Sequence, residues 1–213
     1  MKTRFLIPGL LAVALTGMFT GCATKPYDYT NFRAHPPRSI VVLPPLNEST
    51  DIRGTYGYLS TVTRPLAEMG YYVYPVVVLD EYMKENGLPT AGEMHQAPLN
   101  KIGEVFGADA VLYLTLKQYG SKYQVITSTV TVSAEGKLVD VKTGTVLWEG
   151  AANLQQSSSS GNLIADLVAA AVDQAINSST DQAHNLAHQV SAKLLMTKDH
   201  GLLYGPYYPK EKE

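Results

Sequence analysis

Cys22 is the only cysteine in this chain of 213 residues, and that single thiol limits what the chain can fold into. No intramolecular disulfide can form, and no cluster of thiolates can hold a structural metal. The fold must therefore be stabilised by a hydrophobic core. Residues 22–213 are long enough for one domain that buries about two-thirds of its unfolded surface.

The N-terminal segment has the pattern of a cleavable export signal. Lys2 and Arg4 supply a basic start, residues 5–19 are largely apolar, and Phe19-Thr20-Gly21-Cys22 resembles the lipidation box of bacterial lipoproteins. The apolar run is too short for a membrane span and ends in small residues. We expect cleavage before Cys22 and attachment of fatty acyl chains such as palmitate, two of which suffice for stable anchoring. The alternative is an ordinary secretory signal followed by an unrelated cysteine.

The residue after Cys22 and the net charge indicate where the mature chain resides. Ala23 stands where an aspartate commonly keeps bacterial lipoproteins in the inner membrane, so we expect an outer-membrane anchor with the domain facing the periplasm. Loss of Lys2 and Arg4 with the signal changes the formal net charge from −2 to −4. This mildly acidic balance argues against nucleic acid as a partner, because binding to phosphate backbones requires a basic surface.

Composition divides the chain into four segments. We expect a signal peptide over residues 1–21, a lipidated tether over 22–37, one folded domain over 38–200 and a flexible C-terminal tail over 201–213. Prolines in the tether disfavour helix and stiffen the chain. No later hydrophobic run in the sequence reaches the length of about 18 residues that a membrane-spanning helix needs.

Hydrophobic periodicity predicts an α/β domain with a mixed β-sheet flanked by helices. Residues 39–43 form an apolar run, which is typical of a central strand covered on both faces. From residue 125 the pattern alternates, as in an antiparallel strand with one solvent-exposed face. The other expected strands are 71–79, 110–116, 138–141 and 146–148, with a turn at 142–144. The expected helices are 59–69, 80–86, 98–106 and 163–195, the last preceded by a Ser-rich break at 155–161 and interrupted at 177–180.

A wide apolar stripe on the first part of the C-terminal helix is the main candidate interaction surface. Apolar residues recur there at helical spacing, and three consecutive alanines allow close helix approach. One interpretation is a helix that only covers the sheet, and the other is contact with a second copy, giving a homo-oligomer. The positions assigned to this surface are Leu163, Leu167, Ala170 and Ala171. Tyrosine is also abundant and is enriched at interfaces, although we assign Tyr113 to the core.

Candidate catalytic and metal-binding groups are sparse. His184 and His188 share a helical face with Asp181, but Asn185 stands where a zinc protease needs glutamate, so solvated or partner-facing histidines are favoured. Two further groups are better explained as solvated surface, namely Glu93 with His95 and Glu104, and Asp80 with Glu81 and Glu85. The sequence has no phosphate loop, dinucleotide motif or nucleophile elbow. We expect no metal, no cofactor and no enzymatic activity.

Five stretches of the chain together resemble a family of Gram-negative lipoproteins that includes a meningococcal surface-antigen vaccine candidate. The stretches are 27–30 (YDYT), 37–45 (PRSIVVLPP), 70–76 (GYYVYPV), 84–88 (KENGL) and 106–113 (FGADAVLY). The resemblance covers nearly the whole mature chain. It implies an outer-membrane anchor, a fold similar to the amino-terminal domain of TolB, and no assigned catalytic residues.

A second resemblance concerns the hairpin at residues 138–148. Its sequence LVDVKTGTVLW is similar to the hairpin of the curli-secretion lipoprotein family and of the TolB amino-terminal domain, although Asp-x-x-x-Gly hairpins are common. The resemblance implies a curli-secretion-like lipoprotein as a possible partner. We therefore expect a non-enzymatic assembly or interaction module of an envelope or secretion-type complex. The alternatives are a pore-forming secretion subunit and a periplasmic enzyme.

Overall fold

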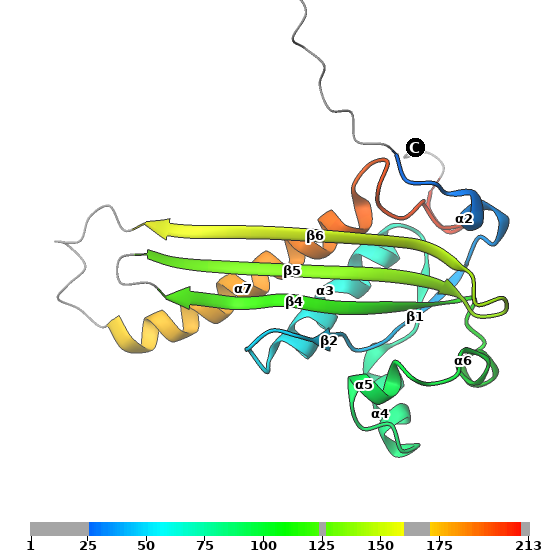
Figure 1. Cartoon of the computed structure of the whole chain (residues 1–213), viewed down its shortest axis with the longest axis horizontal. Coiled ribbons are helices and arrows are strands. Elements are labelled where there is room, and N and C mark those ends of the chain that lie inside the picture. Colours follow the sequence, from blue (N-terminus) through cyan, green and yellow to red (C-terminus); the bar gives the residue numbers. More distant parts are fainter. Residues whose placement is uncertain (1–25, 124–126, 160–170, 210–213) are drawn as a thin grey trace, which may run out of the picture.

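A computed structural model describes residues 26–123, 127–159 and 171–209. The strands are β1 (Ser39–Val42), β2 (Leu46–Asn47), β3 (Tyr72–Val73), β4 (Ala110–Tyr123), β5 (Thr127–Asp140) and β6 (Val146–Ser159). The helices are α2 (Thr30–Ala34), α3 (Gly54–Glu68), α4 (Val76–Glu85), α5 (Ala91–Met94), α6 (Leu99–Phe106) and α7 (Ala171–Met196). In these residues the strands form one sheet in the order β3–β1–β4–β5–β6, with β2 also paired to β4 (Figure 1). β1 pairs in parallel and β4–β6 pair antiparallel, which confirms the expected mixed sheet flanked by helices.

β1 lies between two hydrophobic cores, one on each face of the sheet. Ile40 and Val42 point into the larger core beneath α3 and α7, whereas Val41 and Leu43 point into a smaller core beneath α4–α6. All four side chains are buried. A strand sends successive side chains to opposite faces, so a strand covered on both faces requires an uninterrupted apolar run. The expected central strand is confirmed.

Asp109 joins the starts of β1 and β4. Its carboxylate accepts hydrogen bonds from the backbone N–H groups of Arg38 (3.0 Å) and Ser39 (3.1 Å) and from the Ser39 hydroxyl (3.1 Å). Burial alone would raise the pKa of Asp109, but these donors outweigh burial and hold the pKa below its ordinary value. The charged carboxylate therefore helps to fix the point at which the two parallel strands begin to pair.

β4, β5 and β6 form an antiparallel meander in which each strand has 14 residues. The turn between β5 and β6 forms at the expected position, because Asp140 accepts hydrogen bonds from both the N–H and the hydroxyl of Thr143 at 2.7 Å. Gly144 completes this turn with a φ of 70°, which favours glycine. Figure 1 shows that the meander extends well beyond the end of β1.

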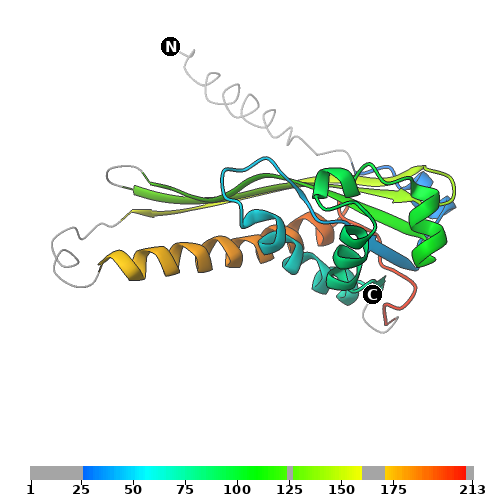
Figure 2. The same ribbon diagram turned by 90° about the horizontal axis from the view of Figure 1, so that it is seen from below.

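α7 and α3 cover one face of the meander, and Figure 2 shows α7 running along the length of the sheet. The residues of α7 buried against this face are Ala183, Leu186, Ala187, Val190, Leu194 and Leu195. α3 packs beside α7, and the hydroxyls of Thr61 and Ser191 form a buried hydrogen bond of 2.6 Å between the two helices. In the part of the chain that the structure describes, no helix is both long enough and apolar enough to cross a membrane.

Two interruptions expected from composition are absent from the described chain. α7 continues through residues 177–180, and β6 continues to Ser159 through most of the expected Ser-rich break. In α7, the polar residues of the expected break each cost only up to about 0.7 kcal/mol, and the packing of the following helical turns outweighs that cost. In β6, residues 155–159 pair in register with residues 127–131 of β5. Tertiary pairing therefore overrides local composition at both places.

The strand expected over residues 71–79 was a wrong prediction. Only Tyr72–Val73 forms a strand, and α4 begins at Val76 directly after Pro75. The three consecutive valines favour a strand by intrinsic propensity. However, the buried residues of α4 are Leu79, Asp80 and Met83, and this i, i+1, i+4 spacing is that of one helical face.

Part of the expected tether belongs to the folded domain. The N–H of Tyr27 donates a 2.9 Å hydrogen bond to the carbonyl of Asp199. Tyr29 and Phe32 are buried in the larger core, where their rings meet edge to face at a centroid distance of 6.4 Å. The folded domain therefore begins at Tyr27, about ten residues earlier than the expected boundary at residue 38.

The segment expected to be a flexible tail is also packed against the domain through residue 208. Leu202 is buried, and the indole N–H of Trp148 donates a 2.8 Å hydrogen bond to the carbonyl of His200. The hydroxyl of Tyr29 donates to the carbonyl of Gly201 at 2.6 Å. The N-terminal and C-terminal segments of the domain therefore hold each other in place.

We predict that a chain starting at Pro26 unfolds cooperatively and that a chain starting at Arg38 is far less stable. The second chain lacks Tyr29 and Phe32, and removal of one large buried aromatic side chain costs about 3–5 kcal/mol. Urea titration followed by the fluorescence of Trp148, the only tryptophan, measures both free energies of unfolding. Equal free energies would show that residues 26–37 are a tether after all.

Candidate functional site

A groove of about 920 Å³ lies on the outer face of the sheet, the face opposite α7. It runs between the sheet and the segment of α5 and α6. The lining residues that matter here are Leu46, His95, Leu99, Tyr113, Lys137 and Glu149. They come from β2, the end of α5, α6 and the three long strands, so the sheet topology brings together residues far apart in sequence.

The groove exists because the helices cover the outer face only in part. α4–α6 pack over Val41, Leu43 and Val111, near the parallel end of the sheet. Further along the meander, the outward-facing side chains are polar and exposed, among them Glu135, Lys137, Asn153 and Gln155. Figure 1 looks onto this uncovered part of the outer face. The polar face predicted by the alternating pattern is therefore found in the described residues of β5.

His95 closes the groove at its helical side. Its ring meets the ring of Tyr113 edge to face at 5.3 Å, and its Nε2 atom lies 2.9 Å from the carbonyl oxygen of Pro44. A carbonyl only accepts hydrogen bonds, so Nε2 carries the proton. Burial lowers the pKa of His95 below its ordinary value, although the Pro44 contact acts in the opposite direction. The His95 ring therefore stays neutral at lower pH values than a solvent-exposed histidine does.

Tyr113 is half-buried at the base of the groove and is not the core residue expected from its apolar run. Burial raises the pKa of its hydroxyl, so the ring stays neutral. The ammonium group of Lys137 lies over this ring at 5.8 Å from its centroid. A cation over an aromatic face contributes roughly 0.5–1 kcal/mol at an exposed site. The Tyr113 ring therefore contacts both the His95 ring and the ammonium group of Lys137.

Charges of both signs border the groove. Lys117 pairs with Glu48 at 3.0 Å and with Glu135 at 3.4 Å; the Lys117 side chain is partly exposed and both glutamate side chains are more than half exposed. Exposed pairs of this kind contribute about 0–1 kcal/mol each to stability. Lys137 and Glu149 are direct cross-strand neighbours. These charged side chains therefore contribute little to the stability of the fold and can interact with a partner instead.

Two of the carboxylates considered as catalytic candidates, those of Asp80 and Glu93, form hydrogen bonds that stabilise the helices. Asp80 accepts hydrogen bonds from Lys84 at 2.6 Å and from Tyr56 at 3.3 Å. Glu93 forms a capping box with Thr90 at the start of α5. These contacts tie the carboxylates to the helices they sit on.

Metal-binding candidates also lack support. The rings of His184 and His188 lie 4.7 Å apart on α7. Within the described ranges, no group of three histidine, cysteine, aspartate or glutamate side chains is arranged to hold a metal ion.

The described residues that line the groove include none of the site residues predicted from the sequence. Cys22, Leu163, Leu167 and Ala170 lie outside the described residues, and Ala171 is the first residue of α7. The groove itself was not predicted. The only signal for it was the alternating pattern, which indicated a solvent-exposed face but not the position of the helices along it.

The fold and the site define the protein as a single α/β domain with a mixed sheet and an open groove on its outer face. The model of the GNA1162-like lipoprotein family matches residues 27–207, and the chain belongs to this family. It is 41% identical to the lipoprotein NMB1124/NMB1162 of Neisseria meningitidis serogroup B, over 97% of this chain and 98% of that protein.

The solved structure of a relative gives the same result for the fold. The crystal structure of lipoprotein GNA1162 from Neisseria meningitidis is 45% identical and superposes with a TM-score of 0.55, over 66% of this chain and 99% of that chain. A PelC dodecamer from Paraburkholderia phytofirmans is 16% identical and superposes with a TM-score of 0.49, over 80% and 91% of the two chains. The expected family and the expected fold class are confirmed by the family match and the GNA1162 structure.

We predict that His95 makes the domain less stable as the pH falls below about 6.5, the ordinary pKa of histidine. The unfolded chain then takes up a proton that the folded chain resists, because the folded pKa of His95 is lowered, so the free energy of unfolding falls with pH. In His95→Gln, which keeps a donor for Pro44, the loss of stability between pH 7 and pH 5 should be smaller. Urea titrations at several pH values measure this loss, with pH 8 as the reference. Parallel curves for the two proteins would contradict the assignment.

Proposed function

We propose that this lipoprotein is anchored to the outer membrane through Cys22, faces the periplasm and acts as a non-enzymatic interaction module. A partner protein docks in the groove on the outer face. The observation that carries this proposal is the partial cover of that face, because α4–α6 stop short and leave an open groove of about 920 Å³.

The lining of the groove suits a protein segment. Tyr113 offers a rigid ring with a polar tip, and aromatic residues of this kind are enriched at protein interfaces. Leu46 and Leu99 add apolar contact area beside it. Lys137 lies over this ring and Glu149 is the cross-strand neighbour of Lys137, and these opposite charges fix the orientation of a docked segment more than they add affinity. A partner loop with an apolar centre and charged flanks fits this arrangement.

The contacts in the groove also favour binding over catalysis. The proton-bearing nitrogen of His95 donates to the carbonyl of Pro44, and among the described residues no carboxylate is hydrogen bonded to this ring. The Pro44 carbonyl can orient the ring, but it carries no charge that would stabilise an imidazolium as the aspartate of a catalytic triad does. The contacts of His95 therefore support recognition more than triad-type hydrolysis.

Assembly with a second copy, and with a curli-secretion-like lipoprotein, completes the proposal. An acyl anchor confines copies of the chain to a plane and raises their effective concentration, so a weak contact becomes populated. The apolar stripe of the C-terminal helix is the second proposed contact surface, with Leu163, Leu167, Ala170 and Ala171 as its centre.

We predict that Cys22→Ser abolishes anchoring, because a hydroxyl cannot form the thioether that carries the lipid. The variant should remain as an unlipidated precursor and leave the outer-membrane fraction. Cell fractionation and electrophoretic mobility measure the change, with Thr24→Ser as the matched control. Normal fractionation of Cys22→Ser would remove the anchor from the proposal.

We predict that a photo-crosslinking amino acid at position 137 captures a partner in intact cells, whereas the same group at Glu81 does not. Glu81 is exposed on α4 and does not line the groove, so it serves as the control. A third probe at Leu167 tests the helical surface. Mass spectrometry identifies the captured proteins. Capture at neither position 137 nor position 167 would defeat the interaction function.

A further inference from the structure

The folded domain begins very close to the proposed lipid. The N–H of Tyr27 is hydrogen bonded to the carbonyl of Asp199, so the chain is fixed to the domain from this residue onward. Only residues 23–26 separate Tyr27 from Cys22. An extended chain spans at most about 3.6 Å per residue, so these positions are at most about 18 Å apart. The surface around Tyr27 must therefore lie next to the membrane if Cys22 is acylated.

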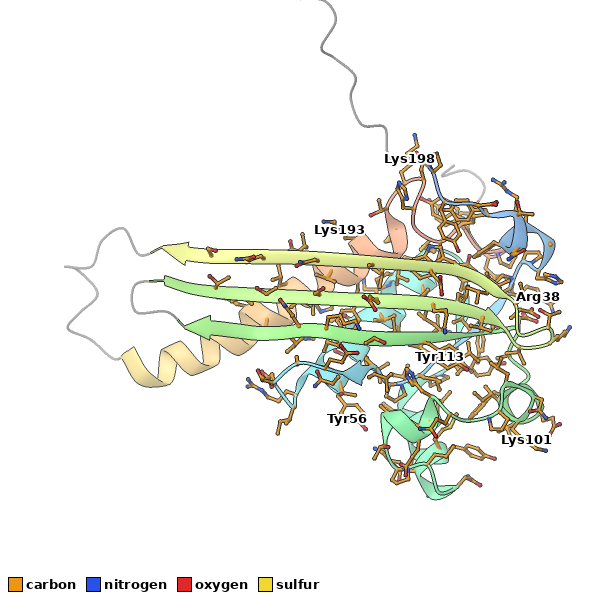
Figure 3. All side chains as sticks on the ribbon, viewed as in Figure 1. Arg38, Tyr56, Lys101, Tyr113, Lys193 and Lys198 are labelled. Atoms are coloured by element: carbon orange, nitrogen blue, oxygen red, sulfur yellow. The ribbon has the colours of Figure 1, made fainter. Side chains whose placement is uncertain are left out.

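That surface is formed by the two ends of the domain, and it is hollowed. A concavity of about 650 Å³ lies between the entering chain and the segment that follows α7. We name this surface the anchor face and define it by Tyr27, Arg33, Met196, Lys198 and Tyr204. Met196 and Tyr204 are 42% and 52% exposed, so both present apolar surface to the solvent on this face. Figure 3 shows Lys198 near α2, with Lys101 on the opposite side of the molecule.

The side chains of the anchor face have the chemistry of a membrane–water interface. Tyrosine rings favour the headgroup level of a bilayer, because the ring is apolar and the hydroxyl is polar. Lys198 and Arg33 can reach lipid phosphates while their aliphatic stems remain on apolar surface. Two acidic residues, Asp28 and Asp199, share the rim of the hollow and limit its positive charge. The anchor face therefore suits phospholipid headgroups through aromatic and apolar contact more than through net charge.

We propose that the anchor face rests on the headgroup layer of the bilayer and orients the domain. The inference rests on the acylation of Cys22 in the proposed function. The acyl chains on Cys22 and the side chains of the anchor face would both attach the domain to the bilayer. Two attachments hold the domain in one orientation, whereas a long tether alone would let it rotate. α4–α6 lie on the side of the molecule away from α2 and then point away from the membrane (Figure 1).

The test uses the full mature lipoprotein with one introduced cysteine. The only native thiol is that of Cys22, so acylation leaves the introduced cysteine as the only site for a fluorescent label. Lys198→Cys places the label on the anchor face, and Lys101→Cys is the matched control on the opposite side. Both proteins are reconstituted into phosphatidylethanolamine–phosphatidylglycerol vesicles with a nitroxide quencher near the headgroups. The proposal expects quenching several-fold stronger at position 198 than at position 101.

The outcomes separate this inference from the anchor itself. Flotation with the vesicles, and the failure of the wild-type chain to take up label, report acylation. Proteins that float but show equal quenching at positions 198 and 101 overturn the orientation and leave the anchor intact. If the proteins do not float with the vesicles and the wild-type chain takes up label, both the acyl anchor and the proposed orientation are overturned. Met196→Cys is a second probe on the same face, and strong quenching there is required as well.

Discussion

The pairing of β1 with β4 is the contact on which the rest of the domain depends. Each of these strands contributes side chains to both hydrophobic cores, so neither core is complete unless the two strands are aligned. Asp109 secures this alignment at the point where the strands begin, with three hydrogen bonds onto Arg38 and Ser39. Burial is favourable only in this register, because a shift by one residue would exchange the two faces of β1.

The unequal cover of the two faces follows from this arrangement. α7 has 26 residues and reaches along the meander, whereas α4, α5 and α6 have only 10, 4 and 8 residues and stay near the parallel strands. The face of the meander under α7 is therefore part of the larger core wherever α7 covers it. The opposite face is buried under α4–α6 near the parallel strands and exposed to solvent further along. The groove lies where this burial ends.

The features that could be predicted from the sequence are those with a local signal. The apolar run of β1, the alternation in β5 and the Asp140 turn each depend on residues close together in the chain. The helical nature of residues 76–79, the unbroken α7 and the packing of Tyr29 depend on distant partners, which the sequence pattern does not reveal. The groove is the extreme case, because Leu46, His95 and Tyr113 meet only once the sheet order is known.

The contact between the two ends of the domain has a mechanical consequence. A force applied through the N-terminal segment reaches the hydrogen bond between Tyr27 and Asp199 before it reaches the sheet. The next resistance is the buried pair of Tyr29 and Phe32, which is held by the hydroxyl bond to Gly201. A pull would therefore separate the ends of the chain first and draw Tyr29 and Phe32 out of the larger core, so tension on the N-terminal segment would lower the stability of the whole domain.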